Sequence, residues 1–173
     1  MSSFKLEIKK VLTAFGKDVV EQAKKNIQTS KISSKGHLYN GMKYKSSVNG
    51  SSVQVAITIA DYWEFMDYGV EGVGGTKADG TNWVKKKVTN NKFKYRKKTP
   101  PPSVFSKITS DRGGQFAIAK SVFHTGLKTT SFFTNPFDAE VEELEAKLIQ
   151  ASLDGIEKGL TQTVINNNNI TIN

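Results

Sequence analysis

Apolar residues recur at steps of three and four near the start of the chain, with lysines and glutamates between them. The positions are Phe4, Ile8, Val11, Leu12, Phe15, Val19, Ala23 and Ile27. Residues with this spacing fall on one face of an α-helix. The pattern therefore predicts an amphipathic helix over residues 4–28, followed by a polar loop in which serine and glycine break the period.

A period of two comes next and is the strongest local signal in the sequence. On both sides of the Asn49-Gly50 pair, over residues 42–48 and 52–59, apolar residues alternate with polar or small ones. Asn-Gly readily adopts the positive φ angles that a two-residue type I′ turn requires. We therefore predict an antiparallel β-hairpin that turns at Asn49 and Gly50, with one buried face on each strand.

Two short helices that end in glycine are predicted further along the chain. Tyr62, Phe65 and Gly69 share a helical face but not a strand face, so a helix ending at Gly69 fits the pattern. Apolar residues within 116–123 share the face of another helix, which Gly126 closes.

The segment between these helices, Val70 to Pro102, is rich in glycine, lysine, asparagine and proline, and we expect a surface insertion. Within it, residues 83–98 either form a second hairpin turning at 89–91 or stay mobile until a partner binds. A short helix is expected to follow the prolines, from Ser103, and to stop near Gly113.

The start of the last helix can be assigned residue by residue. Asn135 suits the N-cap and Pro136 the first helical position. Residues 163–173 form an asparagine-rich tail that either frays or adds Ile170 and Ile172 to a sheet edge. The buried stripe of the helix is expected at Phe137, Val141, Leu144, Leu148, Ala151, Ile156 and Leu160.

These elements predict an α+β fold, in which long N-terminal and C-terminal helices cover a small antiparallel sheet and a basic loop or hairpin is inserted. A length of 173 residues suits one domain, expected over 1–162. The absence of cysteine excludes disulfides and thiolate chemistry and favours assembly in a reducing cytoplasm. No apolar run of 18 residues occurs, so we expect no contact with a membrane.

A net charge of +9 and a pI near 9.6 suit a polyanionic partner. The charge is concentrated in one acid-free segment that also contains Phe93 and Tyr95, whose rings could stack on bases of a single strand. Such a segment either contacts phosphates or simply protects an exposed edge from aggregation. Its basic residues are Lys85, Lys86, Lys87, Lys92, Lys94, Arg96, Lys97 and Lys98.

Catalytic chemistry finds little support. Asp61, Glu64 and Asp67 are three residues apart and could hold a hard cation, but a solvated or ion-paired helix face is the better interpretation. His37 and His124 are the only histidines, and no G-x-S-x-G pattern accompanies them. The glycines of GVEGVGGTKADG lack the G-K-[ST] ending of a phosphate-binding loop. We expect no enzyme activity, no metal and no cofactor.

Four short segments, in chain order, resemble the neck proteins of tailed bacteriophages, also called tail-completion or head-tail connector proteins. ADYWEF at 60–65, closed by Gly69, is similar to the family's Y-x-x-Y-x-E-F-G-T signature. LYNGM at 38–42 is similar to its L-x-x-S-I segment, and prolines 100–102 precede a short helix as in the family. FAIAKSVFHTGLKTTSFF at 116–133 is similar to its A-I-A-x-S-I-x-x-x-G-I-x-x-T-x-F-F segment.

The resemblance implies a structural virion protein that forms a ring, a hexamer or dodecamer, at the junction of head and tail. Such a ring assembles in the host cytoplasm, docks on portal or adaptor and tail proteins, and passes the genome through contacts that ignore sequence. The residues that carry the structural motif are Tyr62, Glu64, Phe65, Gly69, Gly126, Phe132 and Phe133.

Within this motif we expect Tyr62 and Phe65 to pack their helix onto the sheet and Glu64 to orient or pair locally. Two other functions remain open at this point. One is a stand-alone basic nucleic-acid-binding module, and the other is a metal-dependent nuclease that uses Asp61, Glu64 and Asp67.

Overall fold

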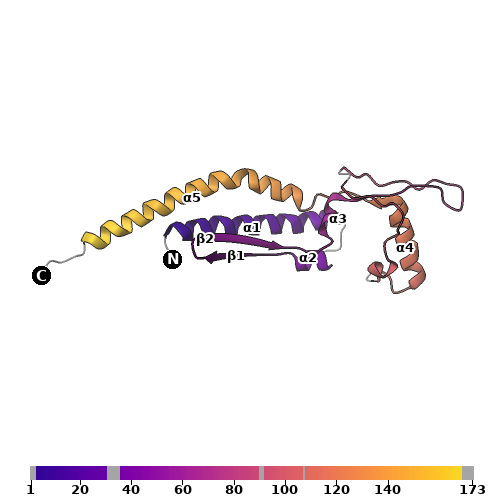
Figure 1. Cartoon of the computed structure of the whole chain (residues 1–173), viewed down its shortest axis with the longest axis horizontal. Helices are drawn as coiled ribbons and strands as arrows, with labels where there is room; N and C mark the ends of the chain where they lie inside the picture. Colours follow the sequence, from indigo (N-terminus) through magenta and orange to yellow (C-terminus); the bar gives the residue numbers. More distant parts are fainter. Residues whose placement is uncertain (1–2, 31–35, 90–91, 107, 169–173) are drawn as a thin grey trace. The chain divides into compact units, whose positions relative to one another are not determined.

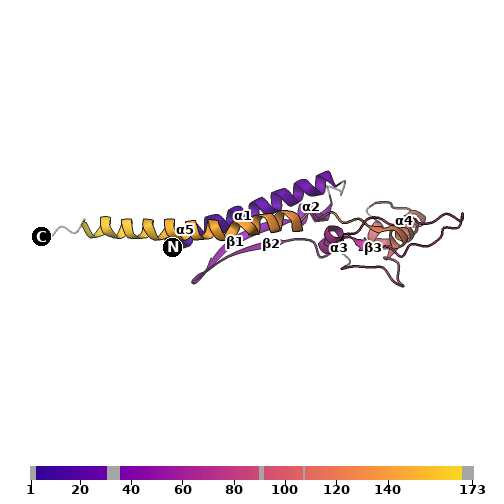
Figure 2. The ribbon, with the colours of Figure 1, turned by 90° about the horizontal axis from the view of Figure 1, so that it is seen from above.

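The computed structural model describes residues 3–30, 36–89, 92–106 and 108–168. The predicted α+β class is confirmed: long N-terminal and C-terminal helices accompany two small antiparallel sheets (Figures 1 and 2). The chain divides into two compact units, where the sequence suggests one domain with an insertion at 70–102. The helical unit comprises Met1–Ala60 and Phe132–Asn173, and the inserted unit comprises Asp61–Ser131.

The helical unit is built in layers around its first helix. Helix α1 (Ser3–Thr29) lies between helix α5 (Thr134–Asn168) and the β-hairpin, as Figure 1 shows. The predicted apolar face of α1 supplies most of the core, with Phe15, Val19, Ala23 and Ile27 buried. A short helix α2 (His37–Gly41) buries Leu38 before the hairpin begins. We expected both long helices to cover one face of the sheet. Instead α1 alone contacts the hairpin in quantity, and α5 packs on the other side of α1.

The hairpin confirms the predicted period of two but shifts its turn by one residue. Strand β1 (Lys43–Asn49) pairs with β2 (Ser52–Thr58), and Asn49 lies opposite Ser52, so Gly50 and Ser51 form the turn. Gly50 has a φ of 56°, whereas Ser51 does not have a positive φ. A type I′ turn needs positive φ at both central residues, so this predicted turn type is wrong.

Helix α5 departs from prediction at both ends. It begins at Thr134, so Asn135 lies in its first turn instead of capping it, and Pro136 still falls where no backbone N–H is needed. It continues to Asn168, so the first part of the expected tail is helical. Ile170 and Ile172 lie outside the described residues.

The buried stripe of α5 also differs from the predicted one. Ala151 is buried as predicted, but Val141, Ile156 and Leu160 are exposed. Gly155, which the predicted stripe does not include, is buried in their place. None of the helices in the described part of the chain has the length and apolarity needed to cross a membrane.

The inserted unit contains short elements. Its helices are α3 (Trp63–Tyr68), the 3-10 turn η1 (Pro102–Phe105) and α4 (Arg112–Thr125), and its strands are β3 (Val70–Glu71) and β4 (Gly126–Leu127). The predicted glycine ends are confirmed, since Gly69 and Gly126 follow α3 and α4 with φ near 80°.

The start of α4 differs from the prediction. Gly113 and Gly114 were expected to stop a helix, but they lie in the first turn of α4. The side chain of Asp111 caps that turn by accepting a hydrogen bond from the Gly114 N–H.

Candidate functional site

The β3–β4 pair joins two segments that lie far apart in the sequence. Val70 lies opposite Leu127, and Glu71 lies opposite Gly126. The backbones approach so closely that a Cβ on Gly69 would lie 2.6 Å from the carbonyl oxygen of Leu127, and a Cβ on Gly126 would overlap that of Val70. Both glycines are therefore required by space as well as by φ.

Three residues that follow β4 fasten its segment to α3. The backbone N–H groups of Thr130 and Ser131 both donate to the Asp67 carbonyl oxygen at 3.0 Å. The Thr129 hydroxyl donates to the Tyr68 carbonyl oxygen at 2.7 Å. These bonds satisfy carbonyl groups at the C-terminal end of α3. No following helical turn is present there to supply N–H donors to them.

A second hairpin was one of two alternatives for the basic segment, and the described residues of the segment lie instead along both edges of the β3–β4 pair. On one edge the Lys86 N–H donates to the Thr125 carbonyl oxygen at 2.7 Å. On the other edge the Glu71 N–H donates to Phe93 O, and the Tyr95 N–H donates to Glu71 O, both at 2.9 Å. The expected turn at Asn90 and Asn91 lies outside the described residues. Backbone pairing with β3 and β4 has replaced pairing within the segment.

Glu71 binds the segment through its side chain as well. Its two carboxylate oxygens each lie 3.1 Å from an ammonium group, one from Lys85 and the other from Lys94. Hydrogen bonds from Lys94 and then Lys85 lower the pKa of Glu71 below its ordinary value. Glu71 was not singled out in the sequence, although it is the one carboxylate between Asp67 and Asp79 and precedes the cluster of lysines.

Glu64 forms an ion pair with Lys92 at 3.1 Å, a partner 28 residues further along the chain and not a sequence neighbour. The ammonium group of Lys92 also lies 4.6 Å from the centroid of the Tyr68 ring. Three of the eight predicted basic residues, Lys85, Lys92 and Lys94, are thus ion-paired within the inserted unit. These ion pairs give the segment a structural role.

The other five basic residues are exposed and make no ion pair with any carboxylate that the structure describes. We call them the unpaired basic set. Attached to a segment whose backbone is fixed by β3 and β4, they present positive charge to solvent. They are Lys86, Lys87, Arg96, Lys97 and Lys98.

The two aromatic residues of the segment contact other rings of the inserted unit and are half-buried. The Phe93 ring lies 4.5 Å from that of Phe65. The Tyr95 ring lies 5.8 Å from that of Phe123, and burial raises the Tyr95 pKa. Stacking on bases would compete with these ring contacts, whereas the side chains of the unpaired basic set are free to meet phosphates.

A stacked pair of rings lies at the start of the segment. The Trp83 and His124 rings lie 5.1 Å apart and nearly parallel, and His124 Nδ1 lies 2.5 Å from the Gly74 carbonyl oxygen. Lys77 lies over the Trp83 ring at 5.3 Å. No sequence pattern joins these residues, because the glycine-rich loop between them has no period.

The remaining motif residues divide between the two units. Tyr62 and Phe65 are both 43% exposed, so the expectation that they pack a helix onto the sheet is wrong. Phe132 is completely buried and its carbonyl oxygen accepts a hydrogen bond from Asn26 Nδ2 at 3.2 Å. Phe133 is buried beside Phe137, with ring centroids 5.6 Å apart.

No group of three His, Cys, Asp or Glu residues capable of holding a metal occurs in the described ranges. Asp61, Glu64 and Asp67 do not converge: Asp61 is exposed, Glu64 binds Lys92, and Asp67 is completely buried. His37 starts helix α2 of the helical unit, whereas His124 lies in the inserted unit. The nuclease hypothesis therefore has no assembled site among these residues.

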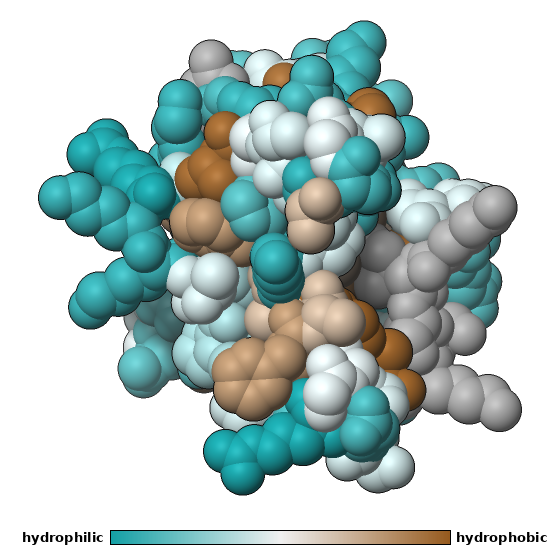
Figure 3. Space-filling model, turned by 90° about the vertical axis from the view of Figure 1, so that its right-hand side faces the viewer, coloured by the Kyte–Doolittle hydropathy of each residue, from teal (hydrophilic) through white to brown (hydrophobic). Residues whose placement is uncertain are grey.

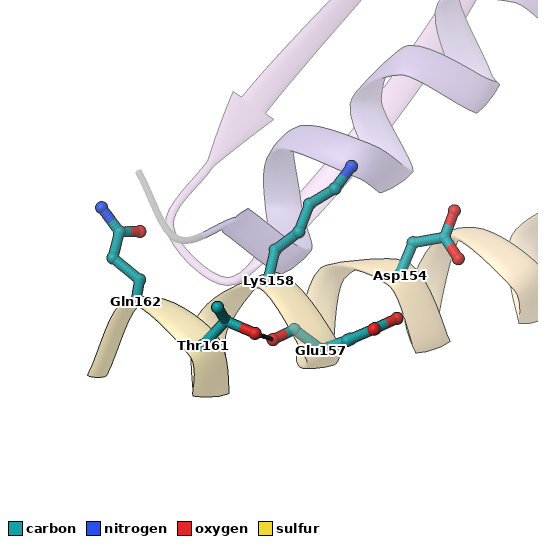
Figure 4. A pocket seen from close by; sticks show the side chains of 5 residues that line it. All are labelled: Asp154, Glu157, Lys158, Thr161 and Gln162. Carbon is teal, nitrogen blue, oxygen red and sulfur yellow. Dashed lines mark hydrogen bonds between the residues drawn. The ribbon is translucent and has the colours of Figure 1, made fainter. Parts of the chain in front are cut away.

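One hollow of about 410 Å³ lies along α5 and is lined by Asp154, Glu157, Lys158, Thr161 and Gln162. Figure 4 shows that these side chains come from a single helix and point in different directions. Lys158 is already bound to Glu7 at 2.8 Å. The hollow lacks the converging polar groups of a small-molecule site.

The end face shown in Figure 3 is mostly hydrophilic, with small apolar patches between the polar side chains. It resembles an ordinary protein surface more than a ligand cleft. No family model matches this chain, and no match is found among the curated proteins or the solved structures.

Proposed function

We propose that this chain is a structural virion protein that forms a ring at the head-tail junction of a tailed bacteriophage. The observation that carries the proposal is the strand pairing and hydrogen bonding between residues 60–71 and 126–131. These segments contain the two longest matches to the neck-protein motifs. They meet at Gly69 of the first motif and Gly126 of the second. A resemblance that depends on separate short motifs gains weight when those motifs contact one another.

The unpaired basic set gives this ring a physical role. Contacts between lysine or arginine and phosphate do not depend on base sequence, so they attract duplex DNA without stopping its passage. The ion pairs of Glu71 and Glu64 hold the segment in place while the unpaired residues face solvent. Other copies of the chain, portal or adaptor proteins and tail proteins complete the proposed set of partners, and no membrane is involved.

Electron microscopy of the purified protein, combined with its solution mass, tests the proposal. We expect class averages of closed rings with a central hole that admits duplex DNA. Particles of the mass of one chain, both alone and in lysates of infected cells, would contradict it. The mass measurement gives the number of copies in the ring.

A stand-alone nucleic-acid-binding module is the second candidate, and the exposure of the unpaired basic set favours it. Deleting residues 84–98 would not separate the two functions, because the deletion removes both segments that flank β3 and β4. Replacing the five unpaired basic residues by glutamine keeps the backbone pairing. Phage that carry this variant are expected to give few DNA-filled particles; normal yields together with lost DNA affinity would favour the stand-alone module.

A further inference from the structure

Helix α5 has apolar residues on two opposite faces. One face packs against α1: Ala151 is buried, and a Cβ on Gly155 would lie 2.5 Å from the Phe4 Cα. Leu144 and Leu148 are half-buried in the same stripe. Because positions 144, 148, 151 and 155 are three or four residues apart, they form one continuous contact with α1.

The opposite face carries a second stripe that nothing in the described chain covers. We call it the α5 seam, and each of its residues is more than half exposed. Its steps of four, three and four match the alternation of a and d positions in a coiled coil, with one further apolar residue at the end. The residues are Ile149, Leu153, Ile156, Leu160 and Val164.

The end of α5 extends past the N-terminal end of α1, as Figures 1 and 2 show. Lys158 reaches Glu7 at 2.8 Å, but a Cβ on Gly159 would meet nothing within 4 Å. The residues beyond include threonine, valine and asparagine, which are weak helix formers. A short helical end of this composition is marginal in water and gains stability when its apolar side is covered.

We propose that two copies of this chain associate through their α5 helices, with the α5 seam of each copy packed against the α5 seam of the other. A stripe with a/d spacing is complementary to itself. Three of the four positions that flank the seam, Gln150, Ser152 and Gly159, carry no charge, and the fourth is Glu157. The carboxylates of residues 138–145 precede the seam, so little like charge lies along it when two copies meet.

The rest of the helical unit offers no matching surface for the seam. Its other exposed large apolar residues in the described ranges are scattered and less than half exposed: Phe4, Leu6, Tyr44 and Val141. Within the helical unit, the α5 seam of another copy is therefore the surface that fits the seam best. This pairing involves α5 and not the basic segment, so it stands independently of the proposed passage of DNA.

The test is sedimentation equilibrium of the full chain with two substitutions, Ile156→Glu and Leu160→Glu. Both residues are exposed in the single copy, so the variant should keep its helix content by circular dichroism. We expect the dissociation constant of the α5 pair to rise at least about thirtyfold, as for loss of central apolar contacts. The matched control, Thr161→Glu with Gln162→Glu, adds the same charge beside the seam and should behave as the unsubstituted chain.

Either of two results would overturn the pairing. One is an unsubstituted chain that stays a single copy up to millimolar concentration. The other is a seam variant that associates as tightly as the control. If rings persist by electron microscopy while the seam variant associates unchanged, the seam proposal alone fails.

Disulfide cross-linking gives an independent measurement, because the chain has no cysteine of its own. A mixture of Leu153→Cys and Ile156→Cys chains should form disulfide-linked dimers on mild oxidation, whether the helices run parallel or antiparallel. Gln162→Cys, on another side of the same helix, should form few. Equal cross-linking of seam and control cysteines would contradict the pairing. Cross-linking without rings would count against the proposed neck function only.

Discussion

At the scale of single residues, Gly126 shows how closely the two strands of the inserted unit meet. Its φ of 82° and the nearby Val70 carbonyl oxygen both exclude a side chain. Gly80 provides a matched case, because its φ is 80° but a Cβ there would meet nothing within 4 Å. Comparing the two positions separates backbone strain from steric overlap.

We expect Gly126→Ala to lower the free energy of unfolding by more than about 2 kcal/mol, and Gly80→Ala by about 1 kcal/mol. Urea denaturation followed by tryptophan fluorescence checks this, since Trp63 and Trp83 both belong to the inserted unit. Equal losses from the two substitutions would show that the strands are less tightly joined than their geometry indicates.

Glu71 offers a prediction about pH. Its pKa is lowered by Lys94 and Lys85, so its stabilising effect is present above the pKa of the unfolded chain and is lost as the pH falls through the folded value. Nuclear magnetic resonance of the Glu71 carboxyl carbon should give a midpoint below the ordinary 4.5. Lys94→Met should raise that midpoint, whereas Lys86→Met should leave it unchanged. A midpoint at or above 4.5 in the unsubstituted chain would exclude the ion pairs.

At the scale of elements, period predicted the helices and the hairpin, but close packing decided the details. The apolar residues of α5 fall on two faces, and a period of 3.6 does not say which face lies inward. Gly155 decides it, because the absence of a side chain lets α1 approach and turns Ile156 and Leu160 outward. Only knowledge of the partner helix could have shown this.

The site was predictable in its charge and not in its arrangement. The cluster of lysines was visible in the sequence, but pairing of Phe93 and Tyr95 with Glu71 depends on a strand of two residues that has no detectable period. The turn at Gly50 differed for a similar reason. Asn-Gly favours one register locally, whereas the cross-strand pairs of the whole hairpin fix another.

Two glycines of α5 test its packing on α1. Gly155→Ala should destabilise the helical unit, because the new Cβ would lie 2.5 Å from the Phe4 Cα. Gly159→Ala should stabilise it by up to about 1 kcal/mol, since alanine favours helix and nothing lies within 4 Å. Thermal unfolding followed by circular dichroism at the helix band measures both. A stabilising Gly155→Ala would show that α1 does not pack closely there.

At the scale of the whole molecule, the net positive charge belongs mainly to the inserted unit, and its effect is measurable as salt dependence. The triple variant Arg96→Gln, Lys97→Gln, Lys98→Gln should reduce the log-log salt slope of duplex DNA binding by about 2.7, at about 0.9 for each phosphate contact. Lys25→Gln, Lys43→Gln and Lys45→Gln, exposed in the helical unit, form the control and should leave the slope nearly unchanged. Equal reductions would mean that only net charge matters.

Because α1 packs on α5, a helix that is synthesised early in this sequence depends on one that is synthesised much later. At about 5 to 20 residues per second, the roughly hundred residues between Thr29 and Thr134 take about 5 to 20 s to synthesise. The whole inserted unit emerges within that interval, whereas the apolar face of α1 waits uncovered. Nascent chains are therefore most open to chaperones during this delay, and a messenger translated slowly between the codons for Thr29 and Thr134 should prolong it.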